Sequence, residues 1–490
     1  MAYIESIQYS PGIKIREIDL SSYAPLYAPV FYGIVGTAPR GRTDRPTFVG
    51  SIEEMTRLLG IPRTNDYGLW ATYCALLGGA SVYFMRVVGA GATKASGSAV
   101  DTQTTPATCL TFRAISEGTW GNNLTVEITN LGGDSYRLIV KDSGQTVHRF
   151  DYVSTDINSP YHITRLLENS NYVEVQVVSN NAPKTQTIAL SGGTDGGIVD
   201  ANAIVAGLDK FASREDVDID VLLAPSWVDD TVVSRLVAIC EARKDCITLI
   251  DTPPNQSPEQ VKDWVNGVGL TRPALNTSYG ACYYPWVYMV NPFVGGTMFL
   301  PPTSVVPYVI AVNDSHGVQY APAGLNRGRL PFLVGTERKL YTGDLELLQS
   351  PDVRVNPIIN SPKFGAIVWG QKTLQTVPTS LDRLNVRRYL LQLEKSLASL
   401  AMNYVFEPNT TSTRKRFVAD ASKLLNYGIQ VEAIKSYTIK CDDEVNPPTL
   451  VENNVMRAVI TITPVKSAEK IWIDVVLTSQ GVDFTNRVGG

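Results

Sequence analysis

The sequence is poor in the residues that identify several large classes of protein. Its 490 residues include three histidines and six scattered cysteines, of which only Cys240 and Cys246 lie close together. This spacing does not match a zinc motif, so we expect reduced cysteines in the core of a protein made in the cytoplasm. The longest apolar stretches, such as residues 281–290, run to about ten residues, whereas a membrane-spanning helix needs roughly 20.

Excess positive charge is also absent. The 43 Lys and Arg residues are outnumbered by 47 Asp and Glu residues, for a formal net charge of −4 at pH 7. Nucleic-acid-binding domains usually carry a basic face or tail, so the composition argues against that class of partner. The first residues lack a basic segment followed by an apolar one, and we expect neither a signal peptide nor membrane insertion.

What the chain does contain is a succession of contrasting segments. Residues 11–20 begin with a Pro-Gly pair and then alternate apolar with charged side chains, which predicts a strand without a nearby hairpin partner. Helices are predicted at 51–60 and 67–79, and a strand at 81–88. From residue 90 to about 197, short alternating runs are separated by Thr, Ser, Gly and Asn, which predicts an inserted all-β domain.

From about residue 200, helices alternate with apolar strands. Three such strands each follow a predicted helix, at residues 218–225, 246–251 and 281–290. This order indicates a largely parallel α/β sheet. An apolar stripe predicts a long amphipathic helix at 380–406, and a second helix is predicted at 412–427, ending at Gly428. The chain then returns to strands, and the whole pattern predicts a mixed, multidomain α/β fold.

Asp314, Ser315 and His316 are the residue types of a hydrolase triad, and they stand side by side. The surrounding segment predicts a helix that starts near two prolines and ends at Gly317. Adjacent helical residues diverge by about 100°, so these side chains would point in different directions. Polar residues and a histidine also suit the end of a helix for structural reasons. A Ser/His hydrolase is therefore a remote alternative.

Other chemical motifs are weaker. Residues 87–96 and 192–197 are glycine-rich but fail the phosphate-loop pattern, and we interpret them as flexible hinges between domains. The acidic segment 214–220 lacks the glycine of a calcium loop and predicts a solvated strand entry. His148 and His162 show no metal-ligand spacing. We therefore expect no catalytic residue, no cofactor, no metal and no enzymatic activity.

A specific succession of short motifs runs through the second half of the chain. The motifs are ACYYPWVYMVNP at 281–292, FLPPTSVVPYVIAVNDSHGVQYAPAG at 299–324, NPIINSPKFGAIVWGQKTL at 356–374, NVRRYLLQLEKSL at 385–397 and FEPN at 406–409. Their order resembles the contractile tail sheath proteins of bacteriophages. PGIKIREID at 11–19 and ITITPVKSAEKIWIDVVLTSQG at 460–481 also resemble the beginning and end of that family.

The resemblance implies a structural subunit that polymerises as stacked hexameric rings around an inner tail tube. The sheath would contract to drive the tube through the host envelope during genome delivery. The implied partners are further copies of this chain, the inner tail tube protein, and the baseplate and tail terminator proteins. The implied location is the virion tail, after assembly in the host bacterial cytoplasm. R-type bacteriocins and extracellular contractile injection systems share this sheath and remain alternatives.

The resemblance and the segment pattern together predict six parts, with an α/β core formed by N- and C-terminal portions of the chain. They are an N-terminal linker arm (1–25), the N-terminal part of the sheath core (26–90), an inserted β-rich outer domain (91–197), an α/β domain (198–370), a C-terminal core domain (371–469) and a C-terminal strand or arm (470–490).

Two terminal strands are expected to act as intersubunit arms, because an unpaired strand can extend a neighbour's sheet. We predict that residues 11–19 and 470–478 form a sheet shared between subunits. Its buried face would carry Ile13, Ile15, Ile471 and Ile473, and its polar face Lys14, Arg16, Glu17 and Asp474. A predicted helical turn also groups Arg414, Lys415 and Arg416, either as a contact for an acidic tube surface or as a solvated helix face.

Overall fold

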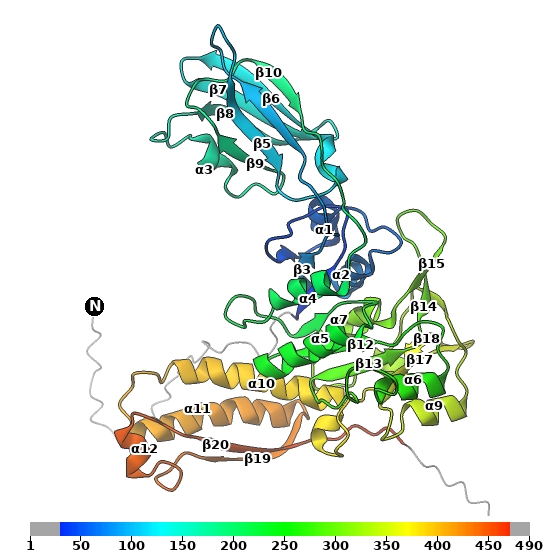
Figure 1. Cartoon of the computed structure of the whole chain (residues 1–490). Helices are drawn as coiled ribbons and strands as arrows, with labels where there is room; N and C mark the ends of the chain where they lie inside the picture. The colour runs from blue at the N-terminus through cyan, green and yellow to red at the C-terminus, as the bar shows by residue number, and fades with distance from the viewer. Residues whose placement is uncertain (1–29, 471–490) are drawn as a thin grey trace, which may run out of the picture.

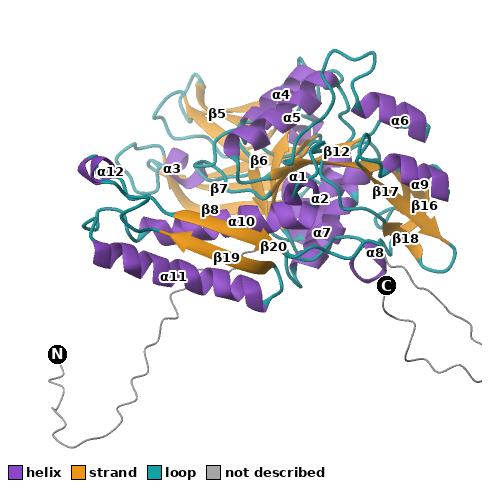
Figure 2. Cartoon of the chain, turned by 90° about the horizontal axis from the view of Figure 1, so that it is seen from below, coloured by secondary structure: helices purple, strands orange, loops and turns teal. Residues whose placement is uncertain are grey.

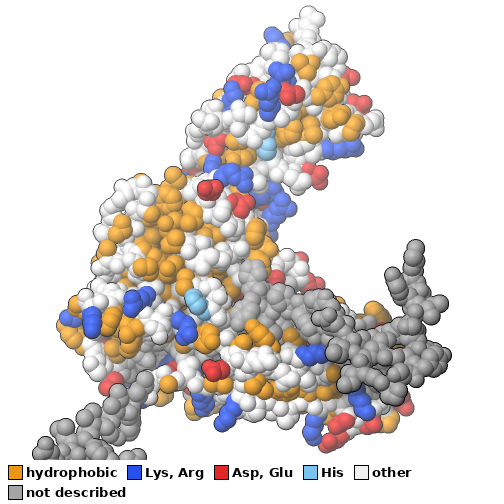
Figure 3. Space-filling view, turned by 180° about the vertical axis from the view of Figure 1, so that it is seen from behind, with side chains coloured by type: hydrophobic (Ala, Val, Ile, Leu, Met, Phe, Trp, Pro, Cys, Tyr) orange, Lys and Arg blue, Asp and Glu red, His pale blue; other side chains and the backbone are white. Residues whose placement is uncertain are grey.

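The structure, a computed structural model of the whole chain, describes residues 30–470. It has three parts, which Figure 1 shows one above another: a β-rich insert, a central body, and a C-terminal module of two long helices and two strands. Seen from behind, the molecule has the outline of a C, with the insert and the C-terminal module at its ends (Figure 3). Within residues 30–470, no helix is both long and apolar enough to cross a bilayer.

The body is built on one eight-stranded sheet with the strand order β18-β17-β13-β12-β11-β1-β3-β2. Its inner strands pair in parallel, and the edge strands β2 and β18 pair antiparallel to their neighbours. The strands are β1 (Phe31–Gly36), β2 (Thr47–Val49), β3 (Ser81–Arg86), β11 (Val221–Leu223), β12 (Ile247–Asp251), β13 (Gly280–Tyr284), β17 (Val355–Ser361) and β18 (Gly365–Val368). The predicted mixed α/β class is confirmed.

Helices cover both faces of this sheet, which explains why β12 and β13 are buried along their whole length. One face packs against α1 (Ile52–Leu59), α2 (Tyr67–Leu77) and α7 (Val306–Asp314). The other packs against α4 (Ala201–Asp209), α5 (Asp230–Arg243), α6 (Pro258–Val265) and α9 (Thr342–Leu348). The short helix α8 (Gly324–Arg327) follows α7. Helix α1 begins where predicted, because the Ser51 side chain accepts a hydrogen bond from the Glu54 amide.

The predicted strand at 281–290 is wrong in one respect, because it forms two strands in different sheets. Strand β13 ends at Tyr284, and β14 (Val287–Val290) pairs with β15 (Thr297–Leu300) and β16 (Leu333–Thr336) in a separate three-stranded sheet. Pro285 lies between them and has no N–H to donate to a ladder, so the first strand cannot continue through it.

The insert consists of two antiparallel sheets that enclose their own apolar core. One contains β10 (Gln186–Ala189), β6 (Leu124–Gly132), β7 (Ser135–Asp142) and β8 (Gln145–Ser154), and the other β4 (Ser96–Val100), β5 (Thr108–Ala114) and β9 (Val173–Val177). A one-turn helix, α3 (Ile163–Leu167), interrupts the β pattern. The glycine-rich segments that enter and leave the insert, expected to be flexible hinges, instead pair: Thr93 and Thr194 exchange two backbone hydrogen bonds of 3.1 Å.

The C-terminal module contains α10 (Leu384–Met402), α11 (Thr411–Gln430), β19 (Ile434–Lys440), α12 (Pro448–Glu452) and β20 (Val459–Pro464). Figure 2 shows β19 and β20 lying along the two long helices. The predicted helix end at Gly428 is wrong, because α11 continues to Gln430. Gly428 serves close packing instead: a Cβ at this position would lie 2.7 Å from Cδ1 of Ile434.

Candidate assembly interface

A buried ion pair joins the C-terminal module to the body. Asp314 is the last residue of α7, and Arg388 lies in the second turn of α10. The guanidinium donates two hydrogen bonds to the carboxylate, one from Nη1 to Oδ1 of 2.7 Å and one from Nη2 to Oδ2. Each side chain is only 4% exposed. Burial raises the pKa of Asp314 and the positive charge of Arg388 opposes that rise, so the carboxylate depends on its partner.

This pairing removes Asp314 from any triad. The Ser315 hydroxyl donates to the Val312 carbonyl at 2.7 Å, and His316 Nδ1 lies 2.9 Å from the same oxygen. A carbonyl can only accept, so His316 Nδ1 carries a proton and cannot receive one from Ser315, 3.3 Å away. The geometry is that of a helix end, as expected, and within residues 30–470 neither His316 nor Asp314 is placed as the base or the orienting carboxylate for a Ser315 nucleophile.

A second polar contact holds α10 against the amino ends of the sheet strands. Lys395 Nζ donates to the carboxylates of Asp218 at 2.7 Å and Asp220 at 2.8 Å, and to the Ile219 carbonyl at 3.0 Å. Burial lowers the pKa of Lys395, but the two carboxylates outweigh it and the pKa is raised. The acidic segment expected to be a solvated strand entry thus includes the anchor for a helix about 175 residues further along.

Arg86 fastens the insert to the body. Its side chain is buried at the end of β3 and donates to the carbonyls of Ala38 at 2.9 Å, Gly41 at 3.2 Å and Glu117 at 2.8 Å. Ala38 and Gly41 belong to the body, whereas Glu117 belongs to the insert. Burial lowers the pKa of Arg86 to about 10, so it remains charged at neutral pH. With the paired linkers, this contact fixes the orientation of the insert.

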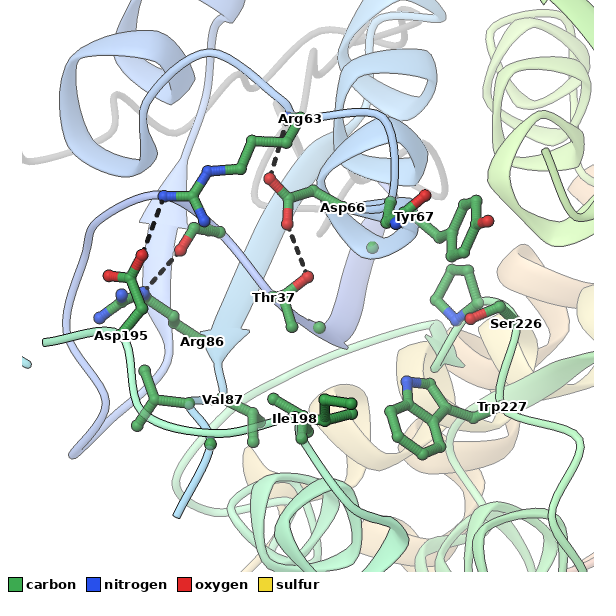
Figure 4. A pocket seen from close by; sticks show the side chains of 18 of the residues that line it. Thr37, Arg63, Asp66, Tyr67, Arg86, Val87, Asp195, Ile198, Ser226 and Trp227 are labelled. Atoms are coloured by element: carbon green, nitrogen blue, oxygen red, sulfur yellow. Dashed lines mark hydrogen bonds and ion pairs between the residues drawn. The ribbon is translucent and has the colours of Figure 1, made fainter. Parts of the chain in front are cut away.

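A cavity of about 620 Å³ lies beside Arg86, at the carboxyl ends of β1, β3 and β11. Figure 4 shows that its charged side chains face one another across the lining. Arg63 pairs with Asp195 at 3.4 Å, and Asp66 accepts from Thr37 Oγ1 at 2.7 Å. The charged groups named here are therefore partnered within the described lining of the cavity.

Asp251 is a buried acid at the end of β12. It accepts hydrogen bonds from the backbone N–H of Thr303 at 2.7 Å, the Thr303 hydroxyl at 2.6 Å and the backbone N–H of Ser226 at 2.8 Å. Burial raises its pKa to about 6, although these donors favour the charged form. The three bonds tie the start of the α7 region to the loop after β11, which is a structural role.

The basic residues predicted to contact the tube do not form one patch. Arg414 is buried and forms an ion pair with Asp443 at 3.0 Å. Arg416 is exposed and pairs with Glu407 at 3.0 Å, and Lys415 is exposed between them. The predicted arm residues Ile13, Lys14, Ile15, Arg16, Glu17, Ile471, Ile473 and Asp474 lie outside the described residues, so their role stays a prediction.

The C-terminal module offers an incomplete sheet close to where the described chain ends. Among residues 30–470, β19 and β20 pair only with each other, in antiparallel register from Lys440–Val459 to Ile434–Pro464. Isolated two-stranded sheets are marginal, and open edges carry backbone groups that another strand can pair with.

Comparison with known proteins identifies the relatives of this chain. Residues 376–478 match the phage tail sheath C-terminal domain family. The tail sheath protein of Enterobacteria phage T4 is 25% identical over 321 residues, which cover 62% of this chain and 48% of that protein. The chain is related to contractile tail sheath proteins. The resemblance read from the sequence motifs is thereby confirmed, and the chain spans about half the length of the curated sheath relatives it matches.

Solved sheath structures share the fold of this sheath relative over most of its length. The sheath tail protein of Listeria innocua superposes with a TM-score of 0.64 at 14% identity, covering 91% of this chain and 94% of that one. The contracted sheath of PVC, an extracellular contractile injection system, gives a TM-score of 0.57 at 15% identity, covering 97% and 99%.

Proposed function

We propose that the protein is the structural subunit of a contractile tail sheath. It polymerises as stacked hexameric rings around an inner tail tube, and the sheath contracts to drive the tube through the host envelope during genome delivery. The observation that carries this proposal is the match of residues 376–478 to the phage tail sheath C-terminal domain. No reaction is needed, since the work comes from the difference between two packings of the subunits.

The terminal arms are the connectors in this proposal. Residues 11–19 and 470–478 of neighbouring subunits add to the open edges of β19 and β20, completing a sheet that the C-terminal module leaves two-stranded. Ile13, Ile15, Ile471 and Ile473 supply its buried face. Such a sheet tethers neighbours through backbone hydrogen bonds while the bodies move.

The remaining partners follow from the same proposal. Lys415 and Arg416, the exposed members of the basic turn, contact the inner tube. The baseplate and tail terminator proteins lie at the two ends of the polymer. The protein assembles in the host bacterial cytoplasm and ends in the virion tail. The curated relatives come from phages, which favours a phage tail over the sheath of an R-type bacteriocin or an injection system.

Negative-stain electron microscopy of the expressed protein tests the proposal. Hollow tubes or striated sheaths are the expected result, and a monodisperse small particle at high concentration would contradict it. A chain lacking residues 1–20 should keep its circular dichroism spectrum but form no tubes. The matched variants are Ile13→Asp with Ile15→Asp, which should abolish tubes, and Lys14→Ala with Arg16→Ala, which should retain them.

The absence of enzymatic activity is part of the proposal and has its own test. Ser315 and His316 both bond to the Val312 carbonyl. Replacing either by alanine should therefore leave tube formation unchanged, and the wild-type protein should not hydrolyse ester or peptide substrates. If the wild-type protein hydrolysed such substrates and Ser315→Ala did not, the result would support the hydrolase alternative.

A further inference from the structure

The turn between α10 and α11 presents an apolar tip to solvent. Phe406 is fully exposed, Met402 is 71% exposed, and Val405 is 51% exposed. The two long helices carry this tip away from the body (Figure 1). A fully solvated phenyl ring beside two other exposed apolar side chains costs hydration free energy that a partner surface would recover. We call these three residues the knob.

The knob is held rigidly rather than carried on a loose loop. On one side, the Tyr404 hydroxyl donates to Asp420 at 2.6 Å, and its ring packs edge-on against Phe417 at 5.3 Å. On the other side, Glu407 accepts from Arg416 at 3.0 Å. Phe406 lies between these two anchors. A preorganised aromatic residue loses little conformational entropy on binding, as is typical of interface hot spots.

The backbone of Phe406 is also in an unfavourable conformation. Its φ is +70°, in the left-handed region that glycine prefers and bulky residues avoid. Glycine would fit the turn better, and in the part of the chain that the structure describes the phenyl ring makes no buried contact that explains its presence. Backbone strain that serves no packing purpose is characteristic of functional positions.

A receptive cavity lies at the other end of the same helix. It measures about 350 Å³ and is lined by the first turns of α10, by residues 319–327 and by residues 464–468. Its walls include the rings of Tyr320 and Tyr389 and the apolar side chains of Leu325, Val386 and Val465. Aromatic and aliphatic walls suit an entering phenyl ring. We call this cavity the socket.

The knob brings no unpaired charge to the socket. Glu407, the acid next to the phenyl ring, is already paired with Arg416 at 3.0 Å, and the socket lining includes Arg327 and Lys466 against a single acid, Glu432. The larger cavity beside Arg86 is a poorer receptor, because a phenyl ring entering it would desolvate the Arg63–Asp195 ion pair.

We infer that the knob of one copy of this chain inserts into the socket of a second copy. The two sites lie at opposite ends of α10, whose 19 residues span about 28 Å. Each copy therefore presents a knob at one end and a socket at the other, and such a head-to-tail contact propagates into a ring or an open helix. The inference rests on the proposed sheath function and assigns it a side-chain contact distinct from the terminal arms.

Phe406→Gly separates an interface role from a structural one. Because the φ of +70° suits glycine, the variant should be at least as resistant to thermal unfolding as the wild type. Its critical concentration for tube formation should nevertheless rise at least about tenfold. Phe406→Tyr keeps the ring and should assemble normally. Val465→Glu in the socket should reproduce the defect, and combining it with Phe406→Gly should add little.

Photocrosslinking identifies the contact directly. The full chain carrying p-benzoylphenylalanine at position 406 is mixed with isotopically labelled full chain, assembled and irradiated. Crosslinked peptides should join residue 406 of one copy to residues 319–327 or 464–468 of another. Crosslinks within one chain, to another surface of the second copy, or to a co-expressed tube protein would overturn the inference.

The outcomes distinguish a failure of the proposed sheath function from a failure of the knob contact alone. If the wild type forms no tubes under any condition, the proposed function fails and the knob contact fails with it. If the wild type forms tubes and Phe406→Gly forms them at the same concentration, only the knob contact fails.

Discussion

Arg388 forms a doubly hydrogen-bonded ion pair with Asp314 across the junction between the C-terminal module and the body, and both side chains are almost fully buried. The two residues are 74 positions apart, one at the start of a long helix and the other at the end of a shorter one. Through this pair and the contacts of Lys395 with Asp218 and Asp220, α10 is fastened to both the helical layer and the sheet. A force applied to the C-terminal module is therefore transmitted to the body.

Breaking this pair from one side should destabilise the protein strongly. Arg388→Met leaves the Asp314 carboxylate buried without its counter-charge, and we expect the free energy of unfolding to fall by about 3–5 kcal/mol. Urea denaturation of the unassembled chain measures the loss. Adding Asp314→Leu to Arg388→Met should recover part of it, because no buried charge then remains. Equal stability of Arg388→Met and the wild type would show that the pair is unimportant for folding.

The titration of Asp251 should make the free energy of unfolding fall as the pH rises from about 4 to about 6. Its folded pKa is about 6, above the ordinary value near 4, so in this window the folded state holds a proton that the unfolded state has lost. Stability is then highest at the acid end and declines through the folded pKa. Relative to Asp251→Asn, which cannot titrate, the wild type should lose on the order of 3 kcal/mol between pH 4 and pH 7. Urea titrations of both proteins across this range provide the comparison, and parallel curves would contradict the shift.

Removing Arg86 should loosen the insert. Arg86→Met leaves the carbonyls of Ala38, Gly41 and Glu117 without their donor, and we expect a loss of about 2–4 kcal/mol together with faster amide exchange in residues 87–93 and 191–197. Hydrogen-exchange mass spectrometry reads out both linkers. Arg63→Met is the matched control, because its exposed ion pair with Asp195 should contribute no more than about 1 kcal/mol. Unchanged exchange in Arg86→Met would mean that the paired linkers alone hold the insert.

Reversing the exposed charge at Lys415 should weaken the proposed contact with an acidic inner tube. An exposed charge contributes up to about 1 kcal/mol, so Lys415→Glu should bind the tube protein up to about fivefold less tightly, and the difference should shrink at high salt. Co-sedimentation with the tube protein at two salt concentrations measures this. Lys262→Glu, an exposed lysine on α6 of the body, controls for net charge. If Lys262→Glu weakened binding to the tube protein by the same factor, the effect would be one of net charge, and α11 would not be the tube contact.

Much of the local architecture can be read from the chain itself. Period-two alternation predicted the β insert, and the succession of helices and apolar strands predicted the α/β body, because both patterns record which side chains face a core. The order of motifs between residues 281 and 410 pointed to contractile sheaths, since a series of short matches in order is specific even when no single one is. The structural end of the helix at Ser315 and His316 also followed from local chemistry.

The tertiary structure decided which distant groups meet. The sequence around Asp314 or Lys395 does not predict which residue each one pairs with, because each ion pair forms only once α10 has packed on the body. Packing likewise explains why Gly428 lies inside a helix, why the glycine-rich linkers pair instead of acting as hinges, and why Arg414 is buried while Lys415 is exposed. Periodicity reports whether a side chain faces a core, but the identity of its neighbour depends on how whole elements pack.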